Sequence, residues 1–203
     1  MKSKVYFTRE LTPEAVVKMY NALGVELPGK VAVKIHTGEQ GNQNYMPPEF
    51  WKPMIDEIGG TVCETNTAYG DASAGVRDHT DTRFECWDKH ASSVVFPEAM
   101  ADAASSIYRH FEGKIAFVNV MKNLSVDCDC CAVAEDPCMA DIGILSSTDP
   151  VAIDQACMDL VMNSDDPGRE HFMERVNSRN GIHTIEAAAE LGFGSREYEL
   201  IEL

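Results

Sequence analysis

The chain has 203 residues, of which 44% are hydrophobic and 25% are charged. These values are ordinary for a globular protein with one sizeable core, so we expect a single domain over residues 1–203 and neither disorder nor a fibrous architecture. Seventeen basic residues against thirty-three acidic ones give a net charge of −16. Such a charge argues against nucleic acid or an anionic membrane surface as a partner.

Targeting signals and disulfides are also disfavoured. No apolar run approaches the roughly 20 residues that a membrane span needs, and the N-terminal MKSKVYFTRE has no apolar signal core. We therefore expect no membrane association and a cytoplasmic location. Seven cysteines is an odd number, and four of them crowd into one loop, which favours thiols, reduced or metal-bound, over a disulfide framework.

The first third of the chain predicts a β-α-β-α-β order. Thr12 is a suitable helix cap and Pro13 fits the first helical position. Alternating and β-branched residues mark the strands, and apolar residues at helical spacing mark the second helix. In chain order the predicted elements are a strand at residues 5–7, a helix from Thr12, a strand at 30–37, a helix over 51–58 and a strand at 61–65.

Strands and helices alternate again after a segment without sustained periodicity, residues 66–96, which we predict to be irregular. The later predicted elements are a helix over 97–111, strands at 114–121 and 141–147, a helix capped by Asp149, helices over 168–178 and 184–191, and a strand at 198–203. This alternation predicts an α/β fold with a mostly parallel mixed sheet flanked by helices in three layers.

The sharpest chemical signal is the cysteine loop, residues 125–141, SVDCDCCAVAEDPCMAD. It holds Cys128, Cys130, Cys131 and Cys138 within eleven residues. Because thiolates ligate iron–sulfur clusters and zinc, we predict that the loop binds an iron–sulfur cluster or a divalent metal such as zinc. The overall spacing C-x-C-C-x6-C matches neither a zinc knuckle nor a bacterial ferredoxin. Three cysteines with a carboxylate or water are an alternative to all four, and surface thiols without a metal are another.

The cysteine loop is also strongly acidic. Asp127 and Asp129 flank the first cysteine and are candidate additional ligands, and no Lys, Arg or His lies between Asn123 and Gly168. Thiolates and carboxylates together repel one another. We therefore expect positive charge from outside this segment, with Lys34 and Lys122 as candidate sources.

A second candidate group follows the strand at residues 30–37. Lys34 and His36 share one face of an alternating strand, and Glu39 lies in the next loop, so the three together suit anion binding or proton transfer. The alternative is an ordinary strand edge followed by a glycine turn. If the strands are parallel, the polar loops at their carboxyl ends converge on one crevice. Cys63 and Cys157, by contrast, are expected to be core residues.

Four blocks of sequence resemble a known family. In order they are VAVKIHTGEQGNQNYMPPEF, GGTVCETNTAYGD, NVMKNLSVDCDC and DIGILSSTDPVAIDQACMDLV. They are similar to the bacterial and archaeal uncharacterized Fe-S center proteins, a domain of unknown function, up to about residue 71 and again from about residue 97 onward. The resemblance implies a suspected iron–sulfur centre and singles out the C-D-C element, Cys128 to Cys130. The relatives' ferredoxin-like module and their long central HFKGH…GG segment have no counterpart here.

Residues and resemblance together predict a metal- or iron–sulfur-binding protein with a redox role, an unspecified reaction and a redox protein as its partner. Cys128 and Cys130 are the strongest ligand candidates. The alternative is a non-redox module with a structural zinc, or an interaction domain without catalytic activity, so whether the chain is an enzyme stays open. A shortened sheet with an uncovered edge would be a reason to form a homodimer.

Overall fold

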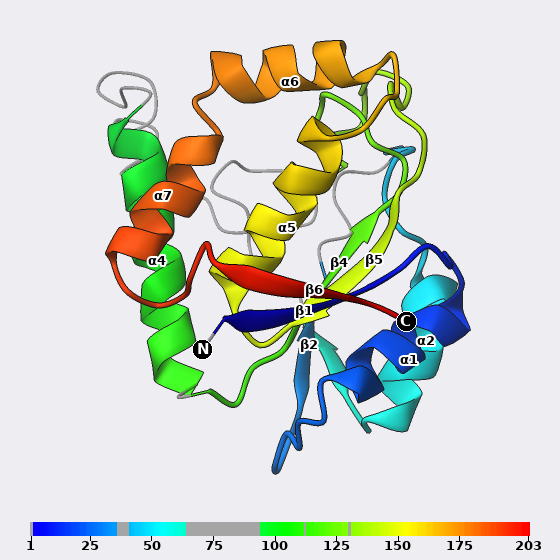
Figure 1. Ribbon diagram of the computed structural model, residues 1–203. Coiled ribbons are helices and arrows are strands. Elements are labelled where there is room, and N and C mark those ends of the chain that lie inside the picture. The colour runs from blue at the N-terminus through cyan, green and yellow to red at the C-terminus, as the bar shows by residue number, and fades with distance from the viewer. Residues whose placement is uncertain (1, 36–40, 64–93, 112, 130) are drawn as a thin grey trace, which may run out of the picture.

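A computed structural model of the chain is shown in Figure 1. The structure describes residues 2–35, 41–63, 94–111, 113–129 and 131–203. The elements within these ranges are β1 (Ser3–Thr8), α1 (Pro13–Ala22), β2 (Ala32–Lys34), α2 (Pro48–Glu57), β3 (Thr61–Cys63), α4 (Val95–Phe111), β4 (Phe117–Met121), β5 (Gly143–Ser147), α5 (Pro150–Met162), α6 (Arg169–Ser178), α7 (Ile182–Glu190) and β6 (Tyr198–Glu202). The predicted irregular segment lies outside the described residues up to residue 93, and α4 begins two residues earlier than predicted.

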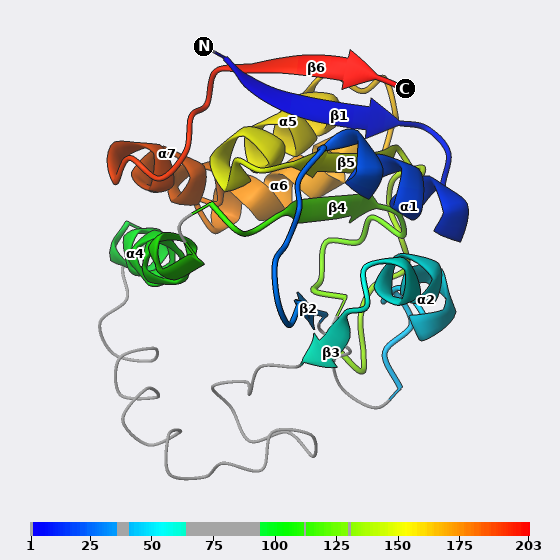
Figure 2. The same cartoon turned by 90° about the horizontal axis from the view of Figure 1, so that it is seen from below.

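A four-stranded mixed sheet with the order β4-β5-β1-β6 forms the centre of the molecule (Figure 2). β1 pairs with β6 in parallel, whereas β5 is antiparallel to both of its neighbours. The predicted α/β fold with a mixed sheet flanked by helices is confirmed, with less parallel pairing in the sheet than we expected. The cause is local: the cysteine loop joins β4 to β5 without a crossover helix, so β5 returns antiparallel to β4. β2 and β3 form a separate parallel pair.

Alternation along the strands divides the interior into two cores, which gives the three layers. Val5, Phe7 and Leu145 pack on the face covered by α5. Tyr6 and Ile144, their neighbours in sequence, pack on the opposite face with α1 and α2. Figure 2 shows α1 in front of the sheet and α5 behind it. The period of two along each strand therefore decides which helices cover which face.

Side-chain caps start α1 and α5 where the sequence predicted them. Thr12 Oγ1 accepts a hydrogen bond from the backbone N–H of Ala15 at 3.1 Å. Asp149 Oδ1 accepts from the N–H groups of Val151 and Ala152, both at 3.0 Å. A proline follows each cap. Each cap satisfies N–H groups that have no partner inside the helix, and the proline at the next position has no N–H to satisfy.

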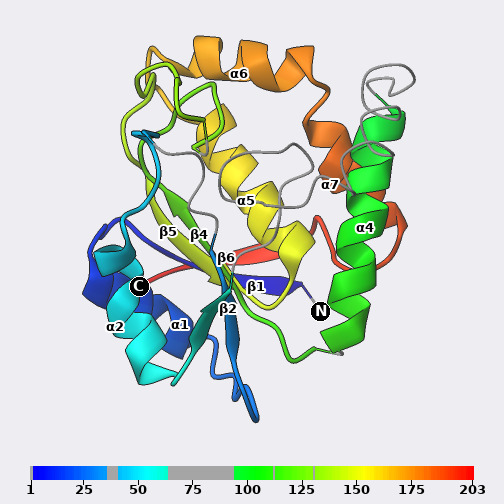
Figure 3. The ribbon, with the colours of Figure 1, turned by 180° about the vertical axis from the view of Figure 1, so that it is seen from behind.

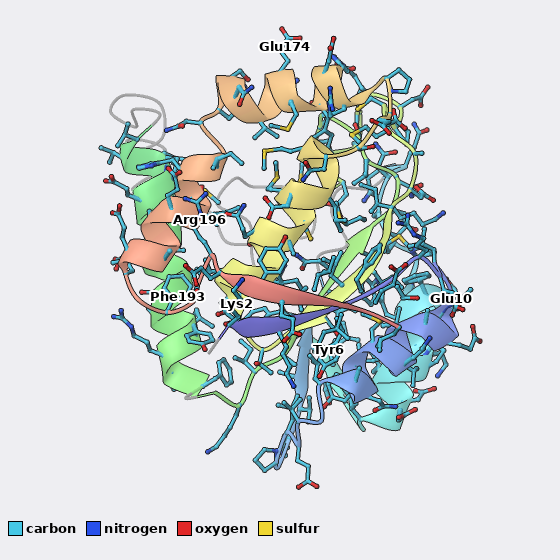
Figure 4. All side chains as sticks on the ribbon, in the orientation of Figure 1. Lys2, Tyr6, Glu10, Glu174, Phe193 and Arg196 are labelled. Atoms are coloured by element: carbon cyan, nitrogen blue, oxygen red, sulfur yellow. The ribbon has the colours of Figure 1, made fainter. Side chains whose placement is uncertain are left out.

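A third, smaller core joins α4 and α7 to the start of α5. It contains Ala101, Val151, Ile185 and Phe193, with Tyr108 packed against it. Figure 3 shows α4 and α7 side by side at one end of the molecule, and Figure 4 places Phe193 beside them. None of the helices in the described part of the chain is both long and apolar enough to cross a membrane.

Candidate functional site

The cysteine loop lies at one edge of the central sheet, between the carboxyl end of β4 and the start of β5. β4 runs in the same direction as β1 and β6, because β5 is antiparallel to both β4 and β1. Figures 1 and 3 both show the loop next to the beginning of α6. The most cysteine-rich segment therefore sits at the edge where these three strands end, which is where α/β sheets tend to bind ligands.

Cys128 and Cys131 are the two ends of a reverse turn. The backbone N–H of Cys131 donates to the carbonyl oxygen of Cys128 at 3.1 Å, which brings the two Cα atoms within about 7 Å of each other. Cys128 is exposed and Cys131 is half-buried. The Cys128 thiol also donates to Oδ1 of the exposed Asp129 at 3.6 Å. Cys130, one of the two strongest ligand candidates from the sequence, lies outside the described residues.

This turn adds a pairing to the interpretation of the cysteine spacing. Taken as a pair, Cys128 and Cys131 have the C-x2-C spacing of a metal-binding knuckle, which the overall pattern C-x-C-C-x6-C conceals. This C-x2-C pair is visible in the sequence, but the C-D-C element, which ends at the intervening Cys130, was favoured instead. Among the cysteines that the structure describes, Cys131 is thus the one that shares a turn with Cys128.

Cys138 stands at the other end of the loop and serves to anchor it. Its thiol donates to the carbonyl oxygen of Leu124 at 3.4 Å, and its backbone N–H donates to the same oxygen at 2.8 Å. Burial raises the pKa of the Cys138 thiol, and the charges of Glu135 and Asp166 act in the same direction. Among the described residues no three His, Cys, Asp or Glu side chains form a group that could hold a metal ion. Whether Cys138 is a ligand stays a prediction.

Helix α6 contacts the carboxylates of the cysteine loop through an arginine and a histidine. Arg175 Nη1 lies 3.1 Å from Asp127 Oδ1, and His171 Nε2 lies 2.9 Å from Glu135 Oε2. The backbone N–H of Glu135 donates to Asp127 Oδ2 at 3.0 Å. This hydrogen bond is the largest cause of the lowered pKa of Asp127, and the hydrogen bond from Arg175 acts in the same direction. Asp127 is thus engaged in holding the loop, while Glu174 points away from the molecule (Figure 4).

The two lysines considered as charge sources differ in their surroundings. Lys122 Nζ lies 2.8 Å from Asp141 Oδ2, so it pairs with a carboxylate at the end of the cysteine loop. Lys34 is exposed at the end of β2, and its register partner is Cys63 on β3. His36 and Glu39 lie outside the described residues, so the group of Lys34, His36 and Glu39 stays a prediction.

The loop after β2 contacts the cysteine loop directly. Asn42 Nδ2 donates to the carbonyl oxygen of Asp129 at 2.9 Å, and Asn44 Nδ2 donates to that of Glu135 at 3.0 Å. Asn44 is buried, and Ser125 Oγ donates to the same Glu135 carbonyl at 2.8 Å. The loops after β2 and β4 therefore meet, although β2 belongs to the separate two-stranded sheet, and the loop after β3 lies outside the described residues. Sequence reasoning did not identify the asparagines, because neither has a metal-ligating or titratable side chain.

The two cysteines expected in the core behave differently. Cys63 is exposed, because β3 belongs to the two-stranded sheet and all three of its residues face solvent, so that prediction is wrong. Cys157 packs against the core on the α5 face, as predicted. Burial raises the pKa of its thiol to about 12. Asn119 Nδ2 approaches the sulfur to 3.5 Å and also donates to Asp154 Oδ1 at 2.9 Å.

The fold and the site define an α/β protein that carries a cysteine-rich loop at a sheet edge. Residues 75–159 match the family described as Domain of unknown function (DUF362). This segment includes β4, the whole cysteine loop, β5 and most of α5. No curated protein and no solved structure matches the chain. The similarity supports the resemblance to a domain of unknown function, and the description of that domain names neither a metal nor a reaction.

Proposed function

We propose that this chain binds a thiophilic metal centre, an iron–sulfur cluster or a zinc ion, through the cysteine loop. The observation that carries the proposal is the reverse turn that brings Cys128 and Cys131 together with C-x2-C spacing. Thiolates are the ligands that both kinds of centre share. Cys130, between them in sequence, is the next candidate thiol.

The surroundings of the turn support this proposal. The loop is fixed from two sides, by Asn44 on the backbone of Glu135 and by Arg175 on Asp127. Metal sites depend on such outer contacts to orient their ligands. The positive charge of Arg175 also reduces the repulsion that thiolate ligands would experience from the carboxylates of the loop. These residues hold and neutralise the loop, and the cysteines provide the donor atoms.

The use of the site depends on the centre that it binds. A cluster would supply electron transfer, whereas zinc would supply a structural cross-link. The turn begins at the exposed Cys128, so a centre held there would lie at the surface, within reach of a redox partner protein. We place this activity in the cytoplasm, where thiols stay reduced, and in line with the uncharacterized Fe-S center proteins that the sequence resembles.

Metal analysis of protein purified without oxygen tests the proposal. We expect a stoichiometric centre in the wild type that the double variant Cys128→Ser/Cys131→Ser loses. Cys63→Ser is the matched control, because Cys63, like Cys128, is exposed but belongs to β3. A visible brown chromophore identifies a cluster, and a colourless protein with bound zinc identifies the structural alternative. Unchanged metal content in the double variant would rule out the assigned ligands.

A further inference from the structure

Helix α4 carries an apolar stripe that faces solvent. Met100, Ile107 and Phe111 are 50%, 57% and 41% exposed, and the exposed Ala104 lies between them. Steps of four, three and four residues place these side chains on one face of the helix. The buried Ala101 belongs to the other side, which packs against α7. α4 therefore has a second apolar face, and the helix lies at one end of the molecule (Figures 1 and 3).

Two charged residues of α4, Glu98 and Arg109, contact α7 on the side away from this stripe. Glu98 contacts His183 of α7 at 3.2 Å, and Arg109 donates to the carbonyl oxygen of Leu191 at the end of α7 at 2.8 Å. The exposed residues beside the stripe include the small Ala99, Ala103 and Ser106, and His110, whose ring packs edge-on against that of Phe111 with the ring centroids 5.3 Å apart. The stripe itself therefore contains no Asp, Glu, Lys or Arg, on a chain with a net charge of −16. Its composition suits an apolar protein surface better than a strongly charged one.

We infer that this stripe is a homodimer interface, in which α4 packs antiparallel against α4 of a second copy. A two-fold axis midway along the stripe sets Ile107 opposite the small Ala104 of the other copy, and Met100 opposite Phe111. Large side chains therefore meet small ones at the centre, as close packing of two helices requires. The antiparallel arrangement also opposes the two helix dipoles.

A second copy is the occupant for electrostatic reasons as well. Two chains of charge −16 repel one another least where their contact surfaces carry no charge, and the stripe is such a surface. A symmetric contact also needs a patch that complements itself, which the large and small residues of the stripe provide. This inference is independent of the metal proposal, because α4 and the cysteine loop are separate elements.

The size of the stripe predicts a weak dimer. α4 has 17 residues and is about 25 Å long. A single helix pair of this length lies at the small end of specific interfaces, below about 1,200 Å². We therefore expect a concentration-dependent equilibrium, with a dissociation constant on the order of micromolar.

Sedimentation velocity of the full chain at increasing concentration tests the inference. We expect wild-type protein to shift from one chain to two, and Ile107→Glu to weaken this association at least about tenfold, because two carboxylates would enter an apolar contact. Ile107 is 57% exposed, so the variant should keep the wild-type circular dichroism spectrum. Leu200→Glu is the matched control, since Leu200 is 41% exposed on the outer strand β6.

A mixing experiment tests the antiparallel geometry. Chains with Ile107→Glu and chains with Ala104→Lys should each be monomeric alone and associate when mixed, because their new charges then face each other across the axis. A wild-type monomer at every concentration would overturn the inference. So would a dimer that Leu200→Glu abolishes and Ile107→Glu preserves, because that result would assign the contact to the sheet edge.

Discussion

Asp149 connects three parts of the fold through one carboxylate. Its Oδ1 accepts the two N–H groups that cap α5, at 3.0 Å each. Its Oδ2 accepts from Ser3 Oγ at 2.6 Å and from the backbone N–H of Ser195 at 3.0 Å. The side chain thus ties the start of α5 to β1 and to the turn before β6. We expect Asp149→Ala to destabilise the whole domain.

The expected loss in free energy of unfolding follows from these four hydrogen bonds. The N-cap contributes about 1 kcal/mol. The bonds from Ser3 and Ser195 contribute about 1 kcal/mol each, a value that allows for partial replacement by water at this half-buried position. The sum is about 3 kcal/mol for Asp149→Ala. Asp149→Asn keeps an oxygen for the cap and loses the acceptor for Ser3 and Ser195, so its cost should be about 2 kcal/mol.

Urea unfolding followed by circular dichroism measures this difference. With a slope of about 2 kcal/mol per molar urea, the midpoint of Asp149→Ala should fall by roughly 1.5 M. Thr12→Ala is the control, because it removes a cap with a single hydrogen bond, from Ala15, and should cost about 1 kcal/mol. If Asp149→Ala lowered the midpoint no more than Thr12→Ala at an unchanged slope, the assigned role of Asp149 would be refuted.

Three further substitutions or modifications test other parts of the structure. Asn44→Ala should weaken metal binding about tenfold in a chelator competition, because the cysteine loop loses a buried anchor; unchanged affinity would contradict that role. Hydrogen bonds to Glu98 and Glu186 raise the pKa of His183. The stability that His183 provides is therefore complete below its unfolded value of 6.5 and disappears as the pH rises through the raised value. His183→Gln should accordingly destabilise the protein more at about pH 6 than at about pH 9. If the variant lowered the unfolding midpoint equally at both pH values, this role of His183 would be contradicted. Cys157, with a thiol pKa of about 12, should be alkylated far more slowly than the exposed Cys63 in timed mass spectrometry, and equal rates would show that it is not buried.

Local elements and the mixed sheet were predictable from the sequence, whereas the register and the direction of each strand were not. The caps at Thr12 and Asp149 depend on residues within three positions, so their helices begin where predicted. The pairing of β1 with β5 joins Tyr6 to Ser146, and no local pattern specifies such a distant register. The direction of β5 follows from a missing crossover helix between β4 and β5, a feature that the overall alternation of strands and helices obscured.

The candidate site likewise combines one local pattern, which the sequence shows, with distant residues, which it does not. The C-x2-C pair of Cys128 and Cys131 is a local pattern that the sequence contains. Its supporting residues are distant: Arg175 lies 48 positions from Asp127, and Asn44 lies 91 positions from Glu135. Only the packing of α6 and of the loop after β2 brings them together. Positive charge for the acidic loop was correctly expected from outside the segment, but α6 was not considered as its source.

Differential alkylation of the natively purified protein tests the metal proposal most directly. A thiol reagent is added without oxygen, before and after a strong chelator, and each cysteine is followed by mass spectrometry. We predict that Cys128 and Cys131 are protected until the chelator removes the centre, while the exposed Cys63 reacts from the start. If Cys128 and Cys131 react as quickly as Cys63 while the protein holds stoichiometric metal, the cysteine turn does not bind it.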